Sequence, residues 1–256
     1  MLIDAGTGIG DLELDDLDSI RHVFLTHAHL DHVAGLPMLA DRVFDENFVE
    51  PLTVYAREET LRAVKDHLFN GIIWPDFTLL PSPERPMLRF QVCSPGDTVT
   101  INHRNFYAVD VMHTVPTLGY TVQNSGGVFA VSGDTKTNET LWPVLNACDD
   151  LRVLVIEVSF PNEMAQLAND AGHYCPNTLV KDLQRLDHEI AWSRSLPMAA
   201  LPSSDLAIEL TQSWLVRYET REVDAVYLIH NAYRDSTRYE PVTDRLIPPP
   251  MPKSAE

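Results

Sequence analysis

A segment with four potential metal ligands, His27, His29, Asp31 and His32, directly follows the apolar run 22–26. An extended stretch directs residues 27, 29 and 31 to one side, and His32 turns inward as a helix begins. Two imidazoles then face one cation, while a carboxylate and an imidazole face a second, a ligand set that suits zinc, manganese or iron. A polar surface turn rarely combines four such residues at this spacing, so we expect a fold that ends a buried strand at a metal site.

Length and composition predict one large domain over residues 1–247, followed by a flexible proline-rich tail over 248–256. With 45% apolar residues the chain can bury a sizeable core. Its net charge of −18 argues against a surface for polymeric nucleic acid, because phosphate backbones are held by Lys and Arg. The acidic balance also fits solubility alone. Bound cations would still allow one small anion to bind locally.

Cysteine usage and hydropathy predict the compartment. The three cysteines are far apart and form no CxxC pair, which favours a reduced, cytoplasmic chain. The sequence contains no apolar run of 18 residues, so we expect no membrane span and no membrane partner.

Strand-like and helix-like patterns alternate along the chain. Strands are expected at 2–4, 22–26, 52–55, 88–92, 105–111, 118–123, 127–131, 153–157 and 225–229. Helices are expected at 12–20, 35–44, 57–69, 139–147, 163–169, 176–186 and 205–218. The alternation predicts an α/β sandwich with sheets in the centre and helices outside.

Further ligand-type residues follow other predicted strands. His113 follows the run 107–112, Asp134 follows 128–132 and His230 follows 225–229. A lone histidine after a strand is more often a capped core or surface residue, but three such sites accompany the first cluster here. Loops at strand ends converge on one rim in layered α/β proteins. The predicted ligand sets are His27, His29 and His113 for one cation, Asp31, His32 and His230 for the other, and Asp134 bridging both.

Together these motifs resemble the metallo-β-lactamase superfamily of binuclear metallohydrolases, from residue 1 to about 186 and again around His230. More narrowly, four regions are similar to the class II 3′,5′-cyclic-nucleotide phosphodiesterases: Leu25–Pro37, Ile73–Phe77, His113–Tyr120, and Glu157–Asn162 with His173–Pro176. The resemblance implies a four-layer αβ/βα sandwich. It also implies two divalent cations, Zn²⁺ first, with Mn²⁺ and Fe²⁺ as alternatives.

Spacing favours a small substrate within that superfamily. Ribonuclease Z members carry a long basic arm between the third histidine and the bridging aspartate. Here only 21 residues separate His113 from Asp134, and two strands with a turn occupy them. We therefore expect a small phosphodiester as the substrate. The resemblance implies that this is cyclic AMP or cyclic GMP, cleaved at the 3′ P–O bond by hydroxide formed on two cations.

The resemblance makes His173 the proton donor to the leaving oxygen, and Asp31 counts as catalytic as well as a ligand. The alternative for His173 is a surface histidine before a helix that starts at Pro176. Glu157 either orients His173 or caps its strand. Asp4 either hydrogen-bonds the metal loop or closes a turn. Trp74 and Phe77 either stack on a purine or pack in the core.

The family usually has an additional strand and glycine-rich turn before the segment that aligns with residues 2–4, so we expect an open sheet edge there. Pairing of two copies through that edge, giving a homodimer, is a further expectation. Two other functions stay open. One is hydrolysis of a lactone, thioester or β-lactam. The other is a truncated, non-catalytic metal-binding homologue.

Overall fold

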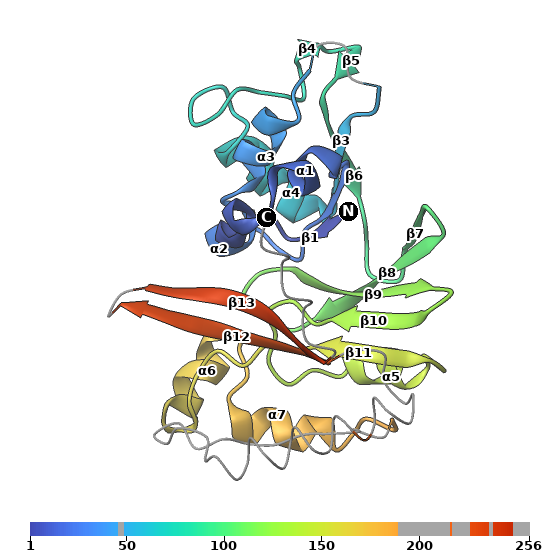
Figure 1. Cartoon of the computed structure of the whole chain (residues 1–256), viewed down its shortest axis with the longest axis vertical. Coiled ribbons are helices and arrows are strands. Elements are labelled where there is room, and N and C mark those ends of the chain that lie inside the picture. The colour runs from blue at the N-terminus through green and yellow to red at the C-terminus, as the bar shows by residue number, and fades with distance from the viewer. Residues whose placement is uncertain (46–48, 189–215, 217–225, 236–237, 248–256) are drawn as a thin grey trace, which may run out of the picture. The chain divides into compact units, whose positions relative to one another are not determined.

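The computed structural model describes residues 1–45, 49–188, 216, 226–235 and 238–247. The chain divides into two compact units, residues 1–189 and 190–256, and each is described by itself (Figure 1). In the second unit, β12 (Val226–Asp235) and β13 (Arg238–Ile247) form an antiparallel hairpin. A single domain over residues 1–247 stays a prediction. The tail at 248–256 and nearly all of the helix predicted at 205–218 lie outside the described residues.

The first sheet of unit 1 has four parallel strands in the order β1 (Leu2–Ile3), β2 (His22–Phe24), β3 (Leu52–Ala56) and β6 (Leu88–Val92). Its central strands are apolar on both faces, as expected where a parallel sheet is covered on both sides. The described chain segments that connect these four strands contain five helices and a small ribbon. They are η1 (Thr7–Asp11), α1 (Leu14–Ser19), α2 (Leu30–Val33), α3 (Leu36–Arg42), α4 (Glu58–His67) and the ribbon of β4 (Pro81–Ser82) and β5 (Arg85–Pro86).

The second sheet has five strands in the order β11-β10-β9-β8-β7. Their bounds are β7 (Thr98–Ile101), β8 (Arg104–Val111), β9 (Thr117–Asn124), β10 (Gly127–Val131) and β11 (Leu151–Val155). The pairs are antiparallel except β10 with β11, which is parallel. The remaining elements are α5 (Leu141–Asn146), η2 (Asn162–Met164), α6 (Ala165–Ala171) and α7 (Pro176–Leu183).

The two sheets pack face to face through aromatic side chains. The Phe24 ring stacks on Phe106, with centroids 4.0 Å apart, and on Tyr55 at 4.5 Å. The buried Tyr120 hydroxyl donates to the Leu25 carbonyl at 2.9 Å. Figure 1 shows α1, α3 and α4 beside the first sheet, and α5 to α7 beyond the second. The predicted four-layer αβ/βα sandwich is therefore confirmed for unit 1.

Most predicted elements in the described residues form, with shifted ends. The strand predicted at 22–26 ends at Phe24 because the Thr26 amide bonds to the Asp4 carboxylate rather than to a neighbouring strand. The predicted strands do not include β4, β5, β7 or β13, and the sequence pattern of 81–86 indicates a loop where β4 and β5 form. β7 is short and its alternate residues are threonines, so its apolar signal is weak. Within the described residues, no helix is long and apolar enough to cross a bilayer.

The Phe24 stack generates a stability prediction. Phe24 is fully buried between the sheets, whereas Phe129 on β10 is 38% exposed. We expect Phe24→Ala to lower the free energy of unfolding by about 3–5 kcal/mol, because it leaves a cavity between the sheets. The matched change Phe129→Ala should cost under about 1 kcal/mol. Denaturant unfolding measures both values, and equal losses for the two variants would contradict this packing account.

Candidate metal centre

The metal loop, residues 25–32, begins where β2 ends. The turn that follows β1 hydrogen-bonds to it and packs against it. The Ala5 amide donates to the His32 carbonyl at 2.8 Å, and the Gly35 amide donates to the Ala5 carbonyl at 2.8 Å. Gly6 passes so close that a Cβ there would lie 1.7 Å from the Asp31 carbonyl oxygen. Glycine at position 6 is thus required by the approach of the two backbones.

His113 and Asp134 come from the second sheet, after the ends of β8 and β10. Gly133 turns the chain with φ +62°, and a Cβ there would lie 2.9 Å from the Leu118 carbonyl oxygen. The Leu118 amide donates to the Thr26 carbonyl at 2.9 Å, which joins the two sheets at this rim. The ends of β2, β8 and β10 therefore meet.

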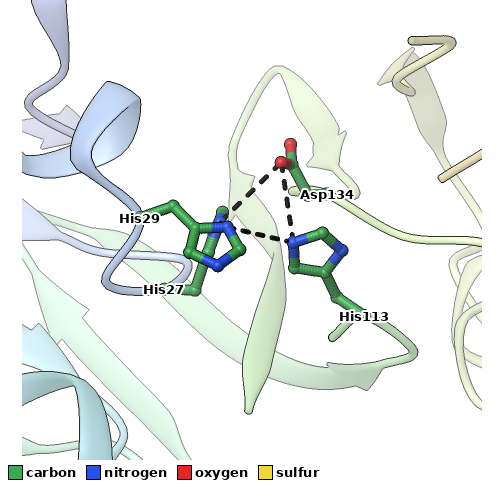
Figure 2. A group of neighbouring side chains, drawn as sticks. All are labelled: His27, His29, His113 and Asp134. Atoms are coloured by element: carbon green, nitrogen blue, oxygen red, sulfur yellow. Dashed lines mark hydrogen bonds and ion pairs between the residues drawn. The ribbon is translucent and has the colours of Figure 1, made fainter. Parts of the chain in front are cut away.

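A first group of four ligand-type side chains converges there: His27, His29, His113 and Asp134 (Figure 2). His29 Nδ1 lies 2.9 Å from His27 Nε2 and 3.2 Å from His113 Nε2. Asp134 Oδ2 lies 3.7 Å from His27 Nε2 and 3.9 Å from His113 Nε2. Three imidazole nitrogens and a carboxylate oxygen facing one point form a donor set that suits a divalent cation such as Zn²⁺.

A second group shares the same carboxylate. Asp31, His32 and Asp134 place one ligand atom each within 4.8 Å of one another. His32 Nε2 lies 3.4 Å from Asp134 Oδ2 and 3.5 Å from Asp31 Oδ2. The structure thus brings together all the predicted ligands except His230. That residue is on β12 in the second unit, and its side chain lies outside the described residues.

Burial and charge separate the two groups electrostatically. Burial, aided by the positive charge of His32, lowers the pKa of His27 to about 3. Burial also lowers the pKa of His113, although the Gly172 carbonyl and Asp134 oppose this. Both imidazoles are therefore neutral at pH 7, which is the form that binds a metal.

His32 and Asp134 behave as an ion pair. Burial opposes charge on His32, but hydrogen bonds with Asp134 and Asp4 outweigh it and raise the pKa of His32 to about 10. Burial acts to raise the pKa of Asp134, but its hydrogen bond and charge interaction with His32 lower it to about 2. A cation that binds His32 must displace its proton, so metal binding at this group is coupled to proton release.

His173 lies beside the first group, and its ring centroid is 4.8 Å from that of His113. Its Nδ1 lies 3.0 Å from Glu157 Oε1. The same carboxylate oxygen accepts from the amide of Thr135, next to Asp134, at 3.1 Å. Of the two roles left open for Glu157, the structure favours the one in which it orients His173. Glu157 also links His173 to the turn that carries Asp134.

The two predicted substrate-stacking aromatics lie in packed positions. Phe77 is 4% exposed and stacks on Phe44, with centroids 5.2 Å apart. Its predicted contact with a substrate base is therefore not supported, because core residues cover the ring. Trp74 packs against the same core cluster. An aromatic sequence motif reads alike whether its rings face a ligand or a core.

Sequence reasoning missed two supports of the ligands. The Gly172 carbonyl lies 2.9 Å from His113 Nδ1, and the Thr26 hydroxyl lies 3.0 Å from His27 Nδ1. A backbone carbonyl 59 positions away leaves no local signal. Thr26 reads as an ordinary β-branched strand residue.

The sequence profile of the Beta-lactamase superfamily domain matches residues 1–193. A protein of Yersinia pestis named "Probable 3',5'-cyclic-nucleotide phosphodiesterase" is 29% identical over 184 residues, covering 66% of this chain and 52% of that protein. A "Ribonuclease Z" of Pyrococcus abyssi (strain GE5 / Orsay) is 32% identical over 125 residues, covering 47% of this chain and 37% of its own length.

Among solved structures, that of unliganded yeast PDE1 superposes with a TM-score of 0.58 at 22% identity. The match covers 80% of this chain and 64% of that one, and at this identity it establishes the shared fold. The chain spans about half the length of the Yersinia relative that it matches.

The shared carboxylate generates a prediction on metal content. After loading with Zn²⁺ and dialysis, we expect two cations per wild-type chain. His113→Ala should retain about one, because it disrupts the first group alone, and Asp134→Ala should weaken both groups. Elemental analysis of the dialysed proteins measures the content. Equal retention by Asp134→Ala and wild type would contradict a shared ligand.

Proposed function

This chain belongs to the β-lactamase superfamily, and we propose that it hydrolyses a small phosphodiester using two divalent cations. The bond cleaved is the 3′ P–O bond of a 3′,5′-cyclic nucleotide. One observation carries the proposal: two ligand groups share Asp134 while His173, supported by Glu157, stands beside the first group. This arrangement supports a proton donor next to a site for an anionic phosphorus centre.

The first group would hold one cation through His27, His29 and His113, and the second group would hold another through Asp31 and His32. Asp134 belongs to both. When bound, the cations supply charge neutralisation for phosphate oxygens and lower the pKa of a water to about 7. His230 as a ligand and Asp31 as a catalytic residue stay predictions.

His173 would supply the proton that the 3′-oxygen needs as it leaves. In its protonated form His173 donates Nδ1–H to Glu157 and keeps Nε2–H for the substrate. A water loses one proton to solvent as its oxygen bonds to phosphorus, the P–O3′ bond breaks, and the Nε2 proton passes to O3′. His173 then takes up a proton from solvent. The product is a nucleoside 5′-monophosphate with a free 3′-hydroxyl.

Three observations support a small diester over a transfer RNA. The interval between His113 and Asp134 is filled by β9, a tight turn and β10, which leaves no room for an inserted arm there. The phosphodiesterase relative aligns over 184 residues and the ribonuclease Z relative over 125. The net charge of −18 also disfavours a polyanionic partner.

The proposal includes a cytoplasmic location and no membrane partner. The three cysteines, Cys93, Cys148 and Cys175, are free thiols, as expected in a reducing compartment. A homodimer is part of the proposal as well. It is supported by β1, which ends the four-stranded sheet, and by a partly apolar cavity of about 610 Å³ that β1 lines together with Phe106, Val122 and Phe129.

A direct assay tests the proposed reaction. The full chain, loaded with Zn²⁺ or Mn²⁺, should convert cyclic AMP or cyclic GMP to the 5′-monophosphate. Asp134→Ala should lower kcat/KM at least about 100-fold, because it removes a ligand from both groups. Circular dichroism verifies that the variant is folded.

Parallel assays with a precursor transfer RNA, a lactone, a thioester and a β-lactam separate the competing functions. Turnover of one of these substrates and of no cyclic nucleotide would overturn the proposal. Two bound cations with no turnover of any substrate would favour a non-catalytic metal-binding protein.

The role of His173 can be tested through the leaving group. His173→Gln should lower kcat for cyclic AMP by about 10²–10⁴-fold, because O3′ is a poor leaving group without a proton. The same variant should lose under about 10-fold on a 4-nitrophenyl phosphodiester, whose leaving group needs no proton. His188→Gln is the control, since His188 Nε2 bonds to the Leu145 carbonyl and His188 belongs to neither ligand group of the described residues. Equal losses on both substrates would contradict proton donation by His173.

A further inference from the structure

We propose that Asp4 is a positioning residue that sets the tautomer of one ligand imidazole in each metal group. It acts on His32 directly and on His27 through the Thr26 hydroxyl. The inference rests on the proposed metal centre and adds a coupling between its two halves. Asp4 itself belongs to neither ligand group.

The Asp4 carboxylate accepts three hydrogen bonds at the rim where the ligand groups lie. Its Oδ1 accepts from the Thr26 amide at 2.7 Å. Its Oδ2 lies 2.8 Å from Thr26 Oγ1 and 2.8 Å from His32 Nδ1. The Asp4 backbone has φ +56°, a left-handed conformation uncommon for residues other than glycine, and its amide donates to the Phe24 carbonyl at 2.8 Å. The side chain is thus held toward the metal loop.

The hydroxyl of Thr26 has a single hydrogen, and this determines which ring nitrogen of His27 carries a hydrogen. A carboxylate only accepts hydrogen bonds, so the Thr26 hydrogen must point to Asp4 Oδ2. Thr26 Oγ1 also lies 3.0 Å from His27 Nδ1, and it has only lone pairs left for that contact. His27 Nδ1 must therefore carry the hydrogen. Thr26 and His27 are both fully buried, so water does not compete for these bonds.

The same carboxylate fixes His32. Its Nδ1 lies 2.8 Å from Asp4 Oδ2, so Nδ1 carries a hydrogen in every state in which this bond persists. In both imidazoles Nε2 is then the nitrogen left for a cation, and Nε2 faces Asp134 in each case. A hydrogen on Nε2 of a neutral ring would occupy the lone pair that a metal requires.

The other two histidines of the centre do not depend on Asp4. His113 Nδ1 is held by the Gly172 carbonyl, and His29 presents Nδ1 to the first group. Asp4 thus controls one imidazole in each group and leaves the rest unchanged. This asymmetry gives the inference a specific signature.

Asp4→Asn is a nearly isosteric test, and asparagine tolerates left-handed backbone. The amide Oδ1 can still accept from the Thr26 amide, but Nδ2 now donates where Oδ2 accepted. Thr26 then turns its hydrogen to His27 Nδ1, and His32 Nδ1 must accept. In both neutral rings Nε2 would carry the hydrogen. The inference predicts a fall in Zn²⁺ affinity of about 10–100-fold at both groups, measured by chelator competition.

Nitrogen-15 NMR of the metal-free protein gives the decisive readout at His27, which Asp4 does not contact. Wild type should show the Nδ1–H tautomer, and Asp4→Asn should show Nε2–H. In the Thr26→Val background, where the relay is absent, Asp4→Asn should leave the His27 tautomer unchanged. Thr26→Ser keeps the hydroxyl and should behave as wild type.

Asp76→Asn is the matched control. The Asp76 side chain is 18% exposed, close to the 20% of Asp4, and it pairs with Lys65 away from the histidines. This variant should retain the metal affinity of wild type. If Asp4→Asn keeps wild-type affinity and an Nδ1–H His27, the inference is overturned. Because neither readout involves turnover, a wild-type chain that binds two cations yet hydrolyses no cyclic nucleotide would contradict the proposed function alone.

Discussion

The Asp134 carboxylate is the contact on which the rest of the site depends. Its Oδ2 lies 3.7 Å from His27 Nε2, 3.4 Å from His32 Nε2 and 3.9 Å from His113 Nε2. One oxygen therefore lies near histidine nitrogens of both ligand groups, and these histidines follow strands of both sheets. If the end of β10 moved away from the end of β2, each group would lose a ligand, because no other side chain in the described residues belongs to both groups.

Packing between the two sheets sets the distance between the end of β2 and the end of β10. Phe24, directly before the metal loop, stacks on Phe106 of the opposite sheet, and the Leu118 amide bonds to the Thr26 carbonyl. The apolar contact and the backbone bond are two residues apart, at the end of β2 and just after it. The chemistry of the rim is thus positioned by aromatic and aliphatic packing in the interior, and the imidazoles and carboxylates lie at the edge of that core.

Local patterns predicted the parts of the site that are local. The spacing of His27, His29, Asp31 and His32 indicated two ligand groups, and the structure separates the same residues into two groups. His113 and Asp134 could be predicted as ligands because strand ends converge in layered α/β proteins. The alternation of strands and helices predicted central sheets with helices outside, and the family resemblance implied the four layers. The strand order β11-β10-β9-β8-β7 is set by pairings that no single segment encodes. The role of Thr26 depends on a carboxylate 22 positions away, so its own sequence context gives no hint. Phe77 shows a different case, since its sequence context allowed either a purine or a core partner, and the ring packs in the core.

Diffraction at a metal absorption edge would test the central claim most directly, using crystals of the full chain grown with Zn²⁺. The account predicts two anomalous peaks about 3.5–4 Å apart, both within bonding distance of the Asp134 carboxylate. One peak would lie among His27, His29 and His113, and the other beside Asp31 and His32. A single peak, or two peaks of which one does not contact Asp134, would contradict the account.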